Sequence, residues 1–288
     1  MPLFDRIVMV DWSAASVPTI GRDSIWIAVA ENGELVSEPE NIATRTQAME
    51  RLVEIAEGHV LIGFDFAFGY PTGTALRFGA SSWTTIWSWL ARELHDEPNN
   101  ANNRFAVAAR FNEHFSEADG PLWGCPPNVT RGGLVPTKPN RMPNGIASRR
   151  HVELLVPKAQ PVWKLAYPGS VGSQVLTGIV RLEEWRRDAR TGDDTSIWPF
   201  ETMFADELGS RIVLAEIYPS LHPITVAENE AKDCAQVRAL AIGYSRLDAA
   251  NELRAHLAGP SDNTVREDVI REEGWIMSVG DAPMPLAA

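Results

Sequence analysis

The sequence predicts an α/β fold in which a mixed β-sheet is flanked by helices. Two observations lead to this prediction. In the first and last thirds of the chain, short apolar runs of strand length alternate with longer segments whose apolar residues recur at helical spacing. Three of the apolar runs also end in an acidic residue, as expected where buried strands reach a common edge of one sheet. With 288 residues, of which 44% are hydrophobic, the chain can build a substantial core.

The first third of the chain predicts three strands, a helix and a fourth strand. The dipeptide Asn32-Gly33 separates two strand-like segments and is typical of a hairpin turn. The helix is indicated by apolar residues at helical spacing between Ala48 and Ala56, followed by Gly58 as a C-terminal stop. In order, we expect strands over 6–11, 24–30 and 34–38, a helix over 44–57 and a strand over 60–65.

The rest of the chain predicts further helices and one more strand. Tryptophan is abundant, and residues such as Trp83 and Trp87 recur at helical spacing, which favours core packing over an exposed stacking surface. The apolar run Ile212–Ala215 predicts the fifth strand. We expect helices over 82–95, 103–116, 181–190, 201–208, 232–242, 245–257 and 264–273, and a strand over 211–217.

The segment from residue 119 to residue 178 differs from the rest in composition. It is rich in proline and glycine, which favours loops over long elements. Long irregular segments in compact domains are often functional. No linker or internal repeat is visible, so we expect one domain over 1–288 with a loop-rich insertion over 119–178. Against the single acid Glu153, the stretch between Cys125 and Val175 contains Arg131, Lys138, Arg141, Arg149, Arg150, Lys158 and Lys164.

Asp11, Asp65 and Glu216 each end a buried apolar run. A carboxylate in such a position costs several kcal/mol unless it is paired, hydrogen-bonded or bound to a metal. If the three strands lie side by side, their carboxylates repel one another and favour a bound cation. Each acid taken alone could instead be structural, accepting backbone N–H groups or pairing with an arginine.

Asp248 is a fourth candidate, at the start of the helix expected over 245–257. The pattern Ser245-x-x-Asp248 resembles a capping box, in which an acid in the first turn satisfies backbone N–H groups. Two interpretations of Asp248 are therefore open. It is either a helix cap or a member of the same acidic site.

Composition narrows the classes of function. Lys and Arg total 26 against 38 acids, a net charge of -12, which does not favour nucleic acid or an anionic membrane as a partner of the whole surface. Cys125 and Cys234 lie far apart and form neither a disulfide framework nor a zinc motif. The chain shows no signal peptide and no apolar run long enough to span a membrane. We therefore expect a soluble, cytoplasmic protein with no membrane partner.

Several short segments together resemble the predicted-nuclease family known as domain of unknown function 429, within the ribonuclease H-like superfamily. They span most of the chain in the family's order. The matching segments are Val10-Asp11-Trp12-Ser13-Ala14, Gly63-Phe64-Asp65-Phe66-Ala67, Trp163-Lys164 with 169–174, Ala215-Glu216-Ile217-Tyr218-Pro219-Ser220, and Asp248-Ala249-Ala250 before Glu273-Gly274-Trp275-Ile276.

The resemblance implies a mixed five-stranded sheet, made of a three-strand meander and two parallel strands. It also implies that acids from the first strand, the fourth strand and a C-terminal helix bind two divalent ions. By position these acids are Asp11, Asp65 and Asp248, with Glu216 on the fifth strand as a fourth catalytic and metal-binding residue. Mg²⁺ or Mn²⁺ suits such oxygen ligands, and two ions about 4 Å apart can promote phosphodiester hydrolysis.

The expected function is therefore divalent-metal-dependent phosphodiester hydrolysis, with nucleic acid or a nucleotide as substrate. In this interpretation the basic insertion contacts phosphate through Arg149, Arg150 and Lys164. One alternative is an ATP-using phosphotransferase of the actin and sugar-kinase type, which shares the sheet topology. Its phosphate turn would lie at 12–16, where this chain has no glycine. The other alternative is a non-catalytic ribonuclease H-like module that binds a ligand or a partner.

Overall fold

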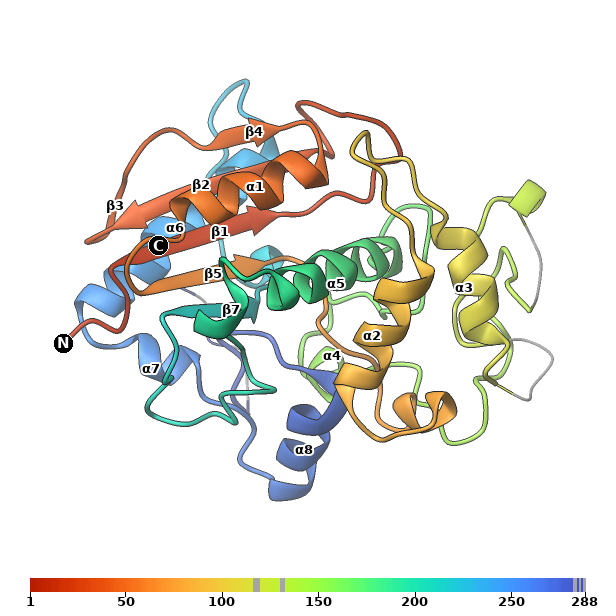
Figure 1. Cartoon of the computed structure of the whole chain (residues 1–288). Helices are drawn as coiled ribbons and strands as arrows, with labels where there is room; N and C mark the ends of the chain where they lie inside the picture. The colour runs from red at the N-terminus through yellow and green to blue at the C-terminus, as the bar shows by residue number, and fades with distance from the viewer. Residues whose placement is uncertain (116–119, 130–132, 282–283, 285, 287–288) are drawn as a thin grey trace.

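In a computed structural model, which describes residues 1–115, 120–129, 133–281, 284 and 286, seven strands of the described chain form one mixed sheet (Figure 1). Their order across the sheet is β3-β2-β1-β5-β7-β6, and β4 pairs with the beginning of β2. The strands are β1 (Arg6–Asp11), β2 (Ile25–Glu31), β3 (Glu34–Leu35), β4 (Glu40–Ile42), β5 (Val60–Phe64), β6 (Thr195–Ile197) and β7 (Ile212–Glu216).

The strand directions confirm the arrangement that the sequence predicts for the five expected strands. β1 runs antiparallel to β2 and parallel to β5, and β5 runs parallel to β7. β3 pairs antiparallel with β2, as the hairpin turn predicts, but has only two residues. The sequence does not indicate β4 and β6, because these three-residue strands contain mostly polar residues. The described sheet is therefore mixed as expected, with seven strands rather than five.

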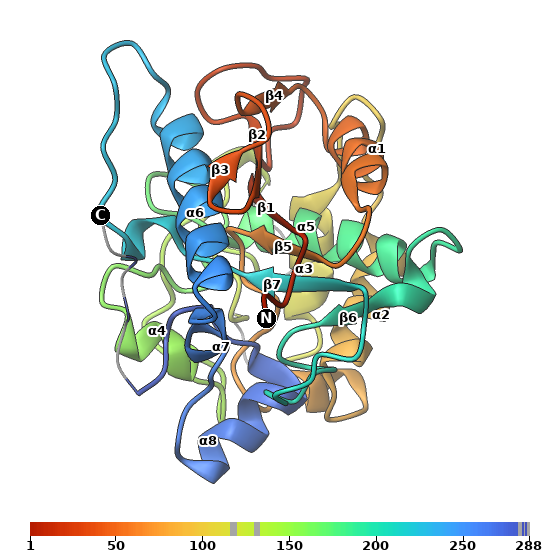
Figure 2. The same ribbon diagram turned by 90° about the vertical axis from the view of Figure 1, so that its left-hand side faces the viewer.

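Helices cover both faces of the sheet (Figure 2). None of the helices in the described ranges is long and apolar enough to cross a bilayer. They are α1 (Arg45–Ile55), α2 (Trp83–Glu93), α3 (Arg104–Asn112), α4 (His151–Leu155), α5 (Gly172–Arg187), α6 (Lys232–Ala249), α7 (Leu253–His256) and α8 (Asn263–Asp268), which continues into a π-helical turn, Val269–Glu273.

Four of the expected helices differ from the structure. The segment 201–208 forms turns and bends instead of a helix. The helices expected over 232–242 and 245–257 are mostly one helix, α6, because a single apolar stripe continues past residue 243. α5 begins at Gly172, inside the expected insertion, instead of at residue 181. Residue 119 and Arg131, both counted in that insertion, lie outside the described residues.

The two faces of the sheet are apolar because strand residues alternate between them. Val8, Val10 and the other strand residues on the same face belong to the core between the sheet and helices α1, α2 and α5. Ile7 and Met9 pack against the opposite side, which α6 covers. Figure 2 shows this layering, with α6 on one side of the sheet and α1 and α5 on the other. The apolar stripe of α6 has the spacing of one helix face: Val237, Leu240, Ala241 and Tyr244.

Helix α6 runs antiparallel to β1, and this direction positions its acidic residues. Near its start, Asp233 accepts a hydrogen bond from the amide of Asp23, in the loop that follows β1. Near the end of α6, Asp248 accepts hydrogen bonds from the amides of Leu3 and Phe4, which precede β1. The beginning of α6 therefore lies at the edge of the sheet where β1 and β5 end.

Candidate active site

Asp11 and Asp65 lie next to each other at the carboxyl ends of β1 and β5. The register pairs Val10 with Phe64, so the next residues, Asp11 and Asp65, project from the same face of the sheet. The two carboxyl groups share a hydrogen bond. Asp65 also accepts a hydrogen bond of 2.6 Å from the amide of Trp12. The sequence-based prediction that the strands bearing these two acids are parallel neighbours is confirmed.

The surroundings of this pair favour a proton or a cation. Burial, and then the neighbouring Asp65, raise the pKa of Asp11 well above its usual range. Burial raises the pKa of Asp65 to about 7, although its hydrogen bond from the Trp12 amide acts in the opposite direction. Two adjacent carboxylates cannot both ionise freely in such a place, so the pair holds a proton more tightly than exposed carboxyls do.

Asp233 is the third acid of this region, and the sequence analysis missed it. Its charge contributes to the raised pKa of both Asp11 and Asp65. The signal in the sequence was the position of Asp233 in the first turn of a predicted helix, where acids are also common for capping. No group of three or more His, Cys, Asp or Glu side chains in the described chain is positioned to hold a metal ion. Asp233 therefore acts on the pair through its charge in this structure.

A cleft of about 640 Å³ opens beside the acidic pair. Asp11 and Trp12 both line the cleft, and Asp65 lies directly behind them, in contact with both. The other walls come from the loop after β1, from the start of α3 and from the segment that leads into α5. The residues that line this cleft include Asp11, Asp23, Asp233, Arg104, Tyr167 and Ser173.

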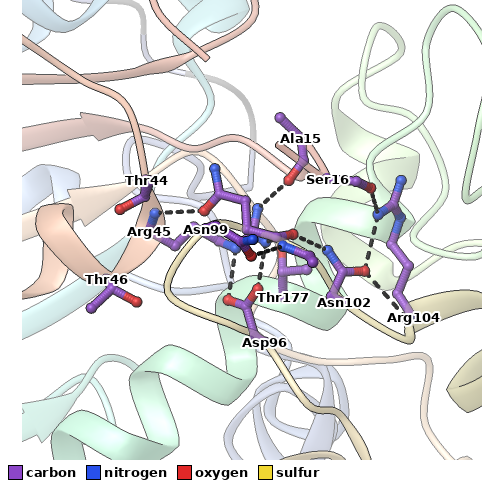
Figure 3. Close-up of polar contacts among 12 residues, drawn as sticks. Ala15, Ser16, Thr44, Arg45, Thr46, Asp96, Asn99, Asn102, Arg104 and Thr177 are labelled. Carbon is purple, nitrogen blue, oxygen red and sulfur yellow. Dashed lines mark hydrogen bonds and ion pairs between the residues drawn. The ribbon is translucent and has the colours of Figure 1, made fainter. Parts of the chain in front are cut away.

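A buried arginine fixes the loop after β1 in place (Figure 3). The Arg45 side chain is fully buried and forms a two-pronged ion pair with Asp96. Its Nη1 donates to the carbonyl oxygens of Ser13, at 2.9 Å, and Ala15, at 2.8 Å. The same guanidinium donates to the carbonyl of Asn100, shortly before α3. Arg45 thus joins α1 to two walls of the cleft.

Asp248 does not belong to this site. It binds the amides of Leu3 and Phe4 at 2.8 and 2.9 Å, beyond the opposite end of β1 from Asp11. The length of β1 alone, from Arg6 to Asp11, is about 17 Å at the usual rise of a strand. The capping interpretation is also wrong, because Ser245 and Asp248 lie in the last turns of α6 and Ser245 accepts the amide of Gly33. The structure shows Asp248 as an anchor for the segment before β1.

We expect Asp248→Ala to lower the free energy of unfolding by about 1–3 kcal/mol, because the buried amide of Phe4 and the partly buried amide of Leu3 lose their acceptor. Binding of divalent ions at the cleft should be unchanged. Chemical denaturation measures the first effect, and divalent-ion binding measures the second. A loss of ion binding at unchanged stability would restore Asp248 to the site.

Glu216 faces away from Asp11 and Asp65. The register pairs Glu216 with Phe64, one residue before Asp65, so alternation along the strands directs Glu216 to the other face of the sheet. There, Nη2 and Nη1 of Arg150 donate to its two carboxylate oxygens at 2.6 and 2.8 Å. Burial raises the pKa of Glu216, and Arg150 opposes that shift. The expected place of Glu216 at the rim of the metal site is therefore wrong.

The expected phosphate contacts of the basic insertion are also not found at the cleft. Arg150 is buried between Glu216 and Glu153, and the opposing effects of burial and these two carboxylates leave its pKa above the usual value. Arg149 donates to the carbonyls of Glu153 and Ala159. Lys164 lies closer to the cleft than these two arginines. Its ammonium group donates a hydrogen bond to the carbonyl of Pro168, which lines the cleft. Among the described residues of the insertion, those that line the cleft all follow Lys164.

Comparisons of the chain with protein-family models, with curated proteins and with solved structures found no match. The chemistry of the cleft is therefore argued from its own residues. Those residues are a half-buried carboxyl pair at the ends of two parallel strands, a third acid from α6 and an arginine from α3.

Proposed function

We propose that this protein is a divalent-metal-dependent hydrolase of phosphate esters. The observation that carries the proposal is the half-buried pair Asp11–Asp65 on one face of the sheet, at the edge of an open cleft. Paired carboxyls of this kind occur where an enzyme needs a cation or a shared proton. The cleft gives a substrate direct access to Asp11.

We further infer that the fold is ribonuclease H-like. The strand order β3-β2-β1-β5-β7, with the first three antiparallel and the last three parallel, supports this inference. So does the packing of α6 against the sheet, with an acid in its first turn near the pair. In this arrangement Asp233 takes the place that the resemblance to domain of unknown function 429 assigned to Asp248.

The donor set fits Mg²⁺ or Mn²⁺. The oxygens of Asp11 and Asp65 are hard ligands. Burial raises the pKa of both carboxyl groups, so a cation beside them would favour their ionised forms. Asp11 and Asp65 would hold the ion, and Asp233 would add negative charge beside it. A bound divalent ion would polarise the phosphate ester and lower the pKa of a water molecule.

The residues of the chain then have separate tasks in hydrolysis. The Trp12 amide fixes the orientation of Asp65, and the shared hydrogen bond fixes Asp11 against it. The walls of the cleft position the ester over Asp11. Hydrolysis joins the oxygen of water to phosphorus and breaks the bond from phosphorus to the leaving oxygen, which takes up a proton.

We expect about 10 mM Mn²⁺ or Mg²⁺ to stabilise the protein by about 1–3 kcal/mol, the range for a site of millimolar to sub-millimolar affinity. Thermal unfolding with and without the ions measures this. An anomalous-scattering map of Mn²⁺-soaked crystals would place the ion. Hydrolysis should be assayed with single- and double-stranded DNA and RNA and with nucleotides.

A matched control comes from Asp248→Asn, which makes the same chemical change at an acid far from the cleft. It should keep the response to Mn²⁺, whereas Asp233→Asn should weaken that response. An ion located away from Asp11 and Asp65 would refute the metal site. Absence of hydrolysis with every substrate, in a protein that still binds Mn²⁺ at this pair, would instead support a ligand-binding module.

A further inference from the structure

Arg104 brings an unneutralised positive charge to the cleft. Its Nε donates to Ser173 Oγ at 3.1 Å, and its Nη1 donates to Ser16 Oγ at 2.7 Å and to Asn102 Oδ1 at 3.0 Å. All three acceptors are neutral. Figure 3 shows the last two of these bonds. Within the described part of the chain, Nη2 of Arg104 has no hydrogen-bond partner, so this donor is free for a ligand.

Other buried arginines nearby are paired with acids. Arg45 and Arg181 both bind Asp96, with closest distances of 2.5 and 2.8 Å. Arg104, by contrast, has no carboxylate at ion-pair distance among the described residues. Burial, followed by the charge of Arg45, lowers the pKa of Arg104 to about 10. An anion placed beside Arg104 would relieve this unfavourable charge, and phosphate is the anion whose geometry suits a guanidinium group.

The cleft also displays an aromatic side chain. Tyr167 lines it with about half of its surface exposed, 52%. The backbone of Tyr167 has φ 73°, a left-handed conformation that is rare for a bulky residue. A turn closed by the amide of Ser170 and the carbonyl of Tyr167, at 3.0 Å, holds this conformation. An exposed ring in a cleft is a surface on which a nucleobase can stack.

We propose that the ligand of this cleft is a nucleotide-sized phosphate ester, whose phosphate binds Arg104 and whose base packs on Tyr167. The proposal rests on the function proposed above and specifies its substrate. A volume of about 640 Å³ lies within the range of sites for small molecules. The net charge of -12 does not suit a long polyanion such as duplex DNA.

The test is calorimetric binding at pH 7 in the presence of EDTA, so that no metal is needed. The probes are adenosine 5′-monophosphate, adenosine and a short DNA duplex. The monophosphate should bind at least about tenfold more tightly than adenosine, as expected for a charge-assisted phosphate contact. The duplex should bind more weakly than the monophosphate.

Three variants assign the contacts. Arg104→Gln should weaken binding of the monophosphate about tenfold or more and leave adenosine unchanged. Arg104→Lys keeps the charge and should recover part of the affinity, which a purely structural role for the guanidinium would not predict. Tyr167→Ala should weaken both ligands by a similar factor. Arg141→Gln is the control, because Arg141 is an exposed arginine that does not line the cleft.

Two results would overturn the proposal. One is equal affinity for adenosine and its monophosphate, and the other is an Arg104→Gln variant that binds the monophosphate as Arg141→Gln does. The metal-free assay also separates this proposal from the hydrolase. Phosphate-dependent binding through Arg104 without any hydrolysis would support the ligand and refute the enzyme. Hydrolysis unaffected by Arg104→Gln would refute the role of Arg104 and leave the hydrolase intact.

Discussion

Replacing Arg150 with alanine is expected to lower the free energy of unfolding by about 3–5 kcal/mol. Arg150 is 2% exposed and is the shared cation of Glu216 and Glu153. Removing it leaves two buried carboxylates without a counter-charge, and the carbonyl of Glu273 loses a donor as well. Chemical denaturation at pH 7 measures the loss. A protein of ordinary stability would be close to unfolding after such a change.

The neighbouring residue provides the control for this experiment. Arg149→Ala removes the same side chain, but the partners of Arg149 among the described residues are the backbone carbonyls of Glu153 and Ala159, so a loss of about 1 kcal/mol is expected. The double variant Glu216→Gln with Arg150→Met should recover part of the stability, because it removes one of the charges that Arg150 leaves unpaired. A stable Arg150→Ala protein with weakened nucleotide binding would return Arg150 to a role in substrate recognition.

Asp65→Asn is expected to abolish divalent-dependent hydrolysis while the fold is retained. Asparagine has nearly the same shape and can still accept the hydrogen bond from the Trp12 amide. It lacks the charge that would hold a divalent ion. The stabilisation by Mn²⁺ should therefore disappear together with the activity, and both are measured on the same preparations. Equal cleavage by wild type and variant would indicate a contaminating nuclease.

The same variant has a predictable dependence on pH. The pKa of Asp65 is raised by burial to about 7 in the folded protein, so the folded state holds this proton more tightly than the unfolded state. The acid form therefore adds stability at low pH, and this contribution is lost as pH rises through about 7. Metal-free Asp65→Asn should exceed wild type by about 1–3 kcal/mol at pH 8, with the difference vanishing towards pH 4. A constant difference across this range would contradict the raised pKa.

The pairing of Asp11 with Asp65 could be predicted from the sequence, because each acid directly follows a continuous apolar run of strand length. Glu216 follows a similar run, but the strand register is not visible in one sequence. In the sheet Glu216 is level with Phe64. An offset of one residue transfers a side chain to the opposite face of the sheet, so Glu216 pairs with Arg150 instead of joining Asp11 and Asp65.

The prediction that Asp248, from the C-terminal helix, joins the site was wrong for a different reason. The sequence indicates helix at both Asp233 and Asp248, and only the direction of packing distinguishes them. The two residues are 15 positions apart in one helix, which corresponds to about 22 Å. The break expected before residue 245 concealed this continuity. Residue type and periodicity identified the element, whereas its contacts with the segment before β1 determined which acid reaches the cleft.

The buried guanidinium of Arg45 has a consequence for recognition. One side chain fixes the carbonyls of Ser13 and Ala15 together with the chain that leads to Arg104. These walls are ordered when the protein folds, before any ligand arrives. Association therefore restricts few of the protein's own torsions, and the entropic cost of forming a complex falls mainly on the incoming molecule. A rigid recognition surface of this kind discriminates between ligands by shape rather than adapting to them.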